Sequence, residues 1–154
     1  MTTAIQAETT EEPRRRIKSR IGEVEIVDSN VLTFPRGLLG FDGRSEYAVL
    51  NLPNPGMERF KLLQSLDDPG LGFIVTEAAS AANEIDPNDL QDAYKQCDVR
   101  PCDALTLLIV SARREAEGVA LSANLRAPIV VDVPRRIGRQ HVMSNGRYPI
   151  RFEL

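Results

Sequence analysis

The apolar residues of this chain come in short runs separated by turn-forming residues, and this pattern restricts the fold more than any other feature. The longest apolar run, "ALTLLIV" at residues 104–110, is far shorter than the roughly 18 residues that a membrane-spanning helix requires. In "GEVEIV" at residues 22–27 the apolar Val24 and Ile26 alternate with Glu23 and Glu25, which is the period of a half-buried strand. The pattern predicts a mainly β protein.

We expect about nine short strands, mainly antiparallel, in a small β-barrel or β-sandwich with one short helix. The "DS" that separates "GEVEIV" from "NVLTF" predicts a tight hairpin between these two strands. The one helix should begin at Asp86 as N-cap with Pro87 in its first position, since Leu90, Ala93 and Tyr94 follow with helical spacing. The other strand candidates are "YAVLNL", "FKLLQSL", "LGFIVTE", "ALTLLIVSA", "GVALSANL", "PIVVDV", "RQHVM" and "PIRFE".

A length of 154 residues suits one domain with a single sizeable core. Residues 1–20 lack apolar periodicity and are rich in Thr, Glu and Arg, so we expect them to form a flexible basic arm before a single β domain at 21–154. The N-terminus has no apolar core of the kind found in secretory signals. We therefore expect a cytoplasmic protein without a membrane segment.

Adjacent carboxylates at Asp67 and Asp68 are the one feature that could indicate a hydrolase or a metal site. They stand directly before Pro69-Gly70 and between two strand candidates, and D-D-P-G is strong turn composition. Neighbouring residues point apart, whereas a catalytic carboxylate pair must converge on one substrate. We interpret the stretch as a turn, with a metal-dependent hydrolase as an alternative.

Other catalytic patterns are missing from the sequence. His141, the only histidine, falls in the strand candidate "RQHVM", and no G-x-S-x-G elbow accompanies it. Cys97 and Cys102 together with His141 supply too few ligands for a structural zinc site. Phosphate-binding glycine motifs are also absent. We expect no enzyme, no metal and no cofactor, and interpret the chain as a binding module.

The charge is unevenly distributed along the chain. Residues 21–125 contain eight basic and seventeen acidic side chains, whereas residues 1–20 have a net charge of +2 and residues 126–154 of +4. An acidic body repels nucleic acid and favours basic partners. The alternative function is an RNA-binding module that uses "RRRIKSR" and the C-terminal arginines, although no aromatic side chain stands among the former to stack on bases.

Two loop segments carry residues that suit partner contact. "GLLGF" at 37–41 offers large apolar side chains between glycines, and "SANLRAP" at 122–128 precedes an apolar strand. In the order "IGEVEI", "VLTFPRGLLGF", "LLQSLDDPGLGFIV", "ANLRAPIVVD" and "YPIR", the chain resembles the flagellar assembly factor FliW family over roughly residues 20–152.

The resemblance implies a small β-barrel-like domain without catalytic activity that holds flagellin before export. It also implies that, once free, the factor binds CsrA, a small RNA-binding translational repressor, and relieves its repression of flagellin mRNA. We expect a monomer that binds flagellin and CsrA but no nucleic acid directly. This chain has Phe152 after Arg151 where the family commonly has His. The partner-binding residues that the resemblance implies are Leu38, Gly40, Phe41, Asp68, Asn124 and Pro128.

Overall fold

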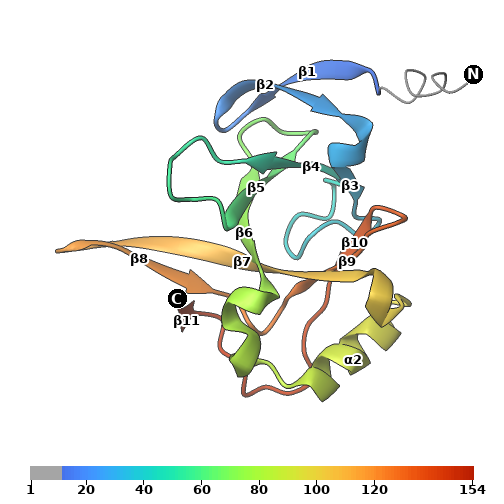
Figure 1. Cartoon of the computed structure of the whole chain (residues 1–154), viewed down its shortest axis with the longest axis vertical. Coiled ribbons are helices and arrows are strands. Elements are labelled where there is room, and N and C mark those ends of the chain that lie inside the picture. The colour runs from blue at the N-terminus through green and yellow to red at the C-terminus, as the bar shows by residue number, and fades with distance from the viewer. Residues whose placement is uncertain (1–11) are drawn as a thin grey trace, which may run out of the picture.

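The structure is a computed structural model that describes residues 12–154 (Figure 1). Antiparallel pairing dominates, and one short helix packs beneath the barrel. The strands are β1 (Arg14–Ser19), β2 (Gly22–Val27), β3 (Val31–Thr33), β4 (Glu46–Asn51), β5 (Phe60–Ser65), β6 (Gly72–Glu77), β7 (Ala104–Glu115), β8 (Gly118–Ala123), β9 (Ile129–Asp132), β10 (Ile137–Gln140) and β11 (Phe152–Glu153). The helical elements are the 3-10 turns η1 (Asp28–Asn30), η2 (Ala78–Glu84) and η3 (Pro101–Asp103), and the α-helix α2 (Pro87–Gln96).

Strand β7 closes the main sheet into a barrel. Its central residues pair with β6 on one side, while its first residues, Ala104 to Leu107, pair with β9. The ring then runs from β6 through β5, β4, β3 and β10 back to β9. The mainly β prediction is confirmed, and of its two alternatives the structure has the barrel. Beyond the ring, β7 and β8 project as a two-stranded ribbon, seen at the left of Figure 1.

The nearly all-apolar first part of β7, residues 104–110, separates two hydrophobic clusters. Leu107 packs in the barrel interior with Phe34, Leu63 and Ile129, while the adjacent Leu108 packs on the outside against the layer that contains α2. Because consecutive strand residues face opposite sides, only a strand covered on both faces can be apolar throughout. This arrangement accounts for the sequence pattern of residues 104–110.

A third hydrophobic cluster lies under the β1–β2 hairpin, which covers the outer face of β4 and β5 at the top of Figure 1. The prediction of a flexible arm is therefore wrong for residues 14–19, and residues 1–11 lie outside the described residues. Arg16 and Lys18 of β1 lie opposite Glu25 and Glu23 of β2, and Ile17 between them pairs with Val24 beside the cluster. Tertiary packing of a few apolar groups thus orders a strand that is polar overall.

Two further local predictions are wrong. The strand at 22–27 pairs with β1 and not with 31–33, because Asp28–Asn30 forms a 3-10 turn in which Asn30 Oδ1 accepts a hydrogen bond from the Val27 amide. His141 lies just after β10, which ends at Gln140, and its amide donates to the Pro128 carbonyl. The helix is where the sequence predicts it.

The N-terminus of α2 has the expected cap. Asp86 Oδ1 accepts a hydrogen bond from the Asn88 amide at 2.8 Å, and Pro87 occupies the first turn. The Tyr148 hydroxyl accepts from the Asp86 amide and donates to Asp89, which ties the helix start to the C-terminal segment. Buried Ala93 faces the outer cluster.

Candidate functional site

The loop between β3 and β4, residues 35–45, closes one end of the barrel, and we name it the plug loop. Its Leu38 is 1% exposed and packs in the interior cluster beside Phe34 and Tyr47. Gly37 and Gly40 have φ values of +68° and +86°, which L side chains rarely adopt. A Cβ at Gly37 would lie 2.5 Å from the Phe41 carbonyl oxygen. The glycines therefore let the chain turn back so tightly that neighbouring leucines face opposite ways.

Outside the barrel, the same loop presents apolar side chains to solvent. Leu39 is 55% exposed and Phe41 is 37% exposed. The Phe41 ring stands edge-on against Phe73 of β6, with centroids 5.3 Å apart. This contact with the Phe73 ring fixes the orientation of Phe41. A partly exposed aromatic side chain on a fixed base is typical of a protein contact site.

Gln140 joins the plug loop to the segment before β9. Its Oε1 accepts a hydrogen bond from the Leu39 amide at 2.9 Å, and its Nε2 donates to the Ala127 carbonyl at 3.1 Å. The two loop segments that the sequence singles out therefore lie side by side, one glutamine side chain apart. Gln140 is a residue that sequence reasoning missed.

Asn124 shapes the backbone of its own segment. Its Oδ1 accepts hydrogen bonds from the amides of Arg126 at 2.9 Å and Ala127 at 3.1 Å. Pro128 is buried, and the Arg126 guanidinium donates to the carbonyls of Tyr148 and Gly146. These contacts give Asn124 and Pro128 a structural role in addition to any contact with a partner.

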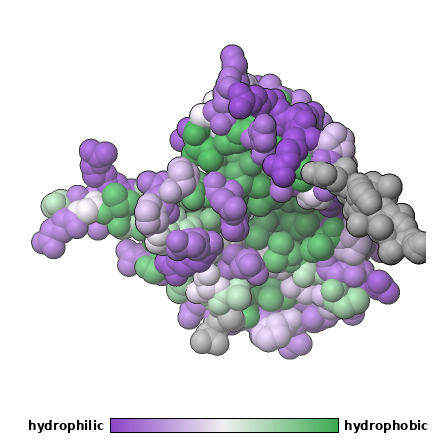
Figure 2. Space-filling view, turned by 45° about the horizontal axis from the view of Figure 1, so that its top comes forward, coloured by the Kyte–Doolittle hydropathy of each residue, from purple (hydrophilic) through white to green (hydrophobic). Residues whose placement is uncertain are grey.

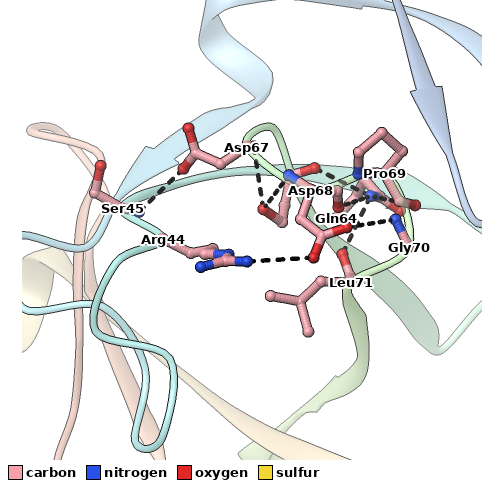
Figure 3. A network of polar contacts seen from close by, with 9 residues as sticks. Arg44, Ser45, Gln64, Asp67, Asp68, Pro69, Gly70 and Leu71 are labelled. Atoms are coloured by element: carbon pink, nitrogen blue, oxygen red, sulfur yellow. Dashed lines mark hydrogen bonds and ion pairs between the residues drawn. The ribbon is translucent and has the colours of Figure 1, made fainter.

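The Asp67-Asp68 pair belongs to a tight turn between β5 and β6 (Figure 3). Asp67 Oδ2 accepts a hydrogen bond from the Ser45 amide at 3.3 Å, while Asp68 Oδ1 accepts from the Gly70 amide at 3.0 Å. The Arg44 guanidinium lies 3.5 Å from the other Asp68 oxygen. Each carboxylate is thus engaged with a different backbone amide, as in a turn, and the two do not converge on one point.

The side-chain amide of buried Gln64 holds this turn in place. Its Nε2 lies 3.1–3.3 Å from the carbonyl oxygens of Asp68, Pro69 and Leu71, as Figure 3 shows. Its Oε1 accepts the Arg20 amide at 2.9 Å and so connects the turn to the β1–β2 hairpin. The turn therefore has a fixed shape and contacts the end of the plug loop through Arg44.

The predicted site residues divide into two groups. Gly40, Phe41 and Asp68 reach the surface, whereas Leu38 and Pro128 are buried and Asn124 is half-buried. We define the loop surface as the exposed residues that the plug loop and the adjacent turn bring together. Its members are Leu39, Gly40, Phe41, Arg44 and Asp68.

His141, Cys97 and Cys102 lie outside this surface. Burial lowers the pKa of His141 and raises the pKa of the Cys97 thiol, while Cys102 is an exposed free thiol. Within residues 12–154, no cluster of three or more His, Cys, Asp or Glu side chains could hold a metal ion. None of the helices in that range is both long and apolar enough to cross a membrane.

The molecule is thus a small closed β-barrel whose loop surface carries exposed apolar side chains. The model of the FliW protein family matches residues 16–154, so the chain belongs to the FliW family. The flagellar assembly factors FliW of Syntrophus aciditrophicus (strain SB) and Nitratidesulfovibrio vulgaris (strain DP4) are 34% and 35% identical to it. The alignments cover 88% and 90% of this chain and 84% and 79% of those relatives.

A solved structure agrees with the sequence comparison. The crystal structure of a flagellar assembly factor FliW superposes with a TM-score of 0.71 at 29% identity. The match covers 90% of this chain and 96% of the other. The chain is therefore a flagellar assembly factor of the FliW family.

Proposed function

We propose that this protein binds flagellin in the cytoplasm and, when flagellin leaves, binds CsrA and relieves repression of flagellin mRNA translation. The observation that carries the proposal is membership of the FliW family over residues 16–154. A binding role accords with the loop surface, where Leu39 and Phe41 are exposed on a rigid support. The acidic body between residues 21 and 125 would attract a basic RNA-binding protein.

The RNA-binding alternative loses support from the position of the basic segment. Arg14 and Arg16 lie 3.8 Å and 3.5 Å from Glu25 and Glu23 of the neighbouring strand. Phosphate contacts need cations whose charge is not already balanced nearby. Two of the segment's arginines are thus paired with carboxylates inside the hairpin.

Calorimetric titration with flagellin and CsrA from the same genome tests the proposal. We expect the wild-type protein to bind each partner with submicromolar affinity, and each partner to weaken the binding of the other. Phe41→Ser should weaken binding of at least one partner about tenfold, because aromatic side chains are enriched among the few interface residues that carry most of the binding energy.

The matched control is Val119→Ser, which removes a 64% exposed apolar side chain from the β7–β8 ribbon, away from the loop surface. This variant should bind both partners like wild type. Binding of neither partner by the wild-type protein would refute the proposed function.

A further inference from the structure

The end of the barrel opposite the plug loop is open, and we name it the barrel mouth. There the start of β3, β5 and β7 and the end of β4, β6 and β9 surround a cavity of about 710 Å³. Figure 2 shows hydrophobic surface lining a hollow on the face that it presents. The cavity has the size of a typical ligand pocket. Sequence reasoning missed it, because strand patterns do not indicate which barrel end remains unfilled.

The walls of the barrel mouth are apolar and come from strands on every side. Val49, Leu105, Leu107 and Val131 contribute side chains from β4, β7 and β9. At the rim, Val133 is 50% exposed. An apolar wall open to water favours the insertion of an apolar group, because insertion removes this surface from solvent.

Cations stand at the same opening. Lys61 shares the inward face of β5 with Leu63, and its amine donates to Asn51 Oδ1 at 2.6 Å. Arg59 and Arg136 also line the mouth, and the Arg59 guanidinium lies 4.7 Å from the centre of the Phe60 ring. These three cations take part in none of the ion pairs found within residues 12–154.

Two carboxylates, Glu58 and Glu77, also line the mouth, and a third, Glu12, is hydrogen-bonded to the lining residue Ser29. Glu58 already accepts a hydrogen bond from the Gly56 amide. An inward-facing lysine beside an apolar wall suits an occupant that presents a carboxylate next to large apolar side chains. A basic occupant would meet unpaired positive charge.

We propose that the barrel mouth is a second docking site, separate from the loop surface, for an acidic protein segment that carries large apolar side chains. The assignment of a protein partner to it rests on the proposed function. A broad opening suits side chains presented by a partner better than it suits a fully enclosed small molecule. Of the two proposed partners, the RNA-binding CsrA is the basic one, so the mouth is the site for flagellin.

The N-terminal segment of this chain is the competing occupant. Glu12 accepts hydrogen bonds from the amide and hydroxyl of Ser29, a residue that lines the mouth, at 2.9 Å and 2.7 Å. The chain before it, "MTTAIQAETTE", has Ile5 and Met1 as its large apolar residues. Such a composition offers little to fill the cavity.

The first experiment tests the mouth without any natural partner. Two synthetic amphipathic peptides that differ only in Glu against Lys on the polar face, each with leucines on the other, are titrated into the full ¹⁵N-labelled chain. The acidic peptide should shift amide signals around the mouth, including Val133 and Lys61, and leave those of Leu39 and Phe41 in place. Equal shifts with both peptides, or none with the acidic one, would overturn the proposal.

The second experiment uses flagellin and CsrA in calorimetry. Val133→Asp and Lys61→Glu should weaken flagellin binding about tenfold and change CsrA binding by less than about twofold. Val119→Asp, on the projecting ribbon, is the matched control, and thermal unfolding establishes that each variant is folded. Unchanged flagellin affinity in both mouth variants would refute the assignment while the proposed function stands.

Two more outcomes separate the remaining cases. If the wild-type chain binds neither partner yet the acidic peptide shifts the mouth, the proposed function fails and the docking site stands. If laurate alone, or deletion of residues 1–11 alone, shifts the mouth signals and the acidic peptide does not, the protein-docking proposal is wrong. The occupant is then a small amphiphile or the N-terminal segment.

Discussion

Replacing Gln64 by leucine should weaken the fold through a single buried amide. Gln64 is 0% exposed, and its Oε1 accepts the Arg20 amide at 2.9 Å. Its Nε2 lies within 3.3 Å of the carbonyls of Ser65, Asp68, Pro69 and Leu71, although it has two hydrogens to share among them. Leucine keeps similar volume and removes all of these bonds.

The expected loss follows from the net worth of a protein hydrogen bond. One accepted bond and two donated bonds at about 1 kcal/mol each give about 3 kcal/mol, and the turn carbonyls near the surface recover part of this from water. We therefore expect Gln64→Leu to lower the free energy of unfolding by about 2–3 kcal/mol. Urea unfolding followed by far-UV circular dichroism measures the difference.

Control variants separate the amide from the general cost of substitution. Gln96→Leu, on the exposed face of α2, should change the free energy of unfolding by less than about 0.5 kcal/mol. Gln64→Glu should lose more than Gln64→Leu near neutral pH, because a carboxylate would face carbonyl oxygens without a hydrogen to donate. A loss below about 0.5 kcal/mol in Gln64→Leu would refute the role given to this side chain.

Further substitutions and titrations test other parts of the structure. Gly138→Ala places a Cβ 2.5 Å from the Phe34 ring and should cost about 2 kcal/mol, measured as a lower unfolding temperature; an unchanged temperature would contradict the packing. Asn124→Ala should cost about 1 kcal/mol through its lost backbone bonds, and Asn124→Asp should retain most of the stability in the same urea assay. Burial lowers the pKa of His141, so the folded state favours neutral imidazole, and stability present above about pH 6.5 should fall as the pH drops through the folded pKa. The unfolding temperatures of wild type and His141→Gln should therefore differ increasingly as the pH falls below about 6.5. Cys102 should react with a thiol reagent well before Cys97, whose pKa burial raises, and equal rates would be inconsistent with the buried position.

Much of the secondary structure could be predicted because it depends on local patterns. Alternation in residues 22–27 and the apolar run at 104–110 each indicate how many faces of the strand are covered. The cap at Asp86 is equally local. Strand β1 could not be predicted in this way, because Ile17 is its one large apolar residue and the cluster that orders it comes from β2, β4 and β5.

The sequence could indicate which loop segments form the candidate site, but not which of their residues reach the surface. "GLLGF" indicates a loop with apolar residues, yet Leu38 lies inside the barrel and Leu39 outside, and the positive φ of two glycines decides between them. Proximity of this loop to the segment at 124–128 depends on Gln140, which is 101 residues from Leu39 and 13 residues from Ala127 in sequence. The orientation of these side chains and the proximity of these segments depend on tertiary contacts, which leave no local pattern in the sequence.

The joint between β3 and β10 has a consequence for how the barrel opens. It is the parallel pairing of the ring, and it consists of Ile137 opposite Thr33 with the Thr33 amide bonded to the Arg136 carbonyl at 2.9 Å. Local unfolding begins where the fewest bonds must break, so the Thr33 amide should exchange with solvent deuterium sooner than those between β4 and β5. Leu32 of β3 and Arg136 line the mouth, while Gln140 of β10 holds the plug loop. The weakest strand pairing of the barrel, between β3 and β10, therefore adjoins both the mouth and the plug loop.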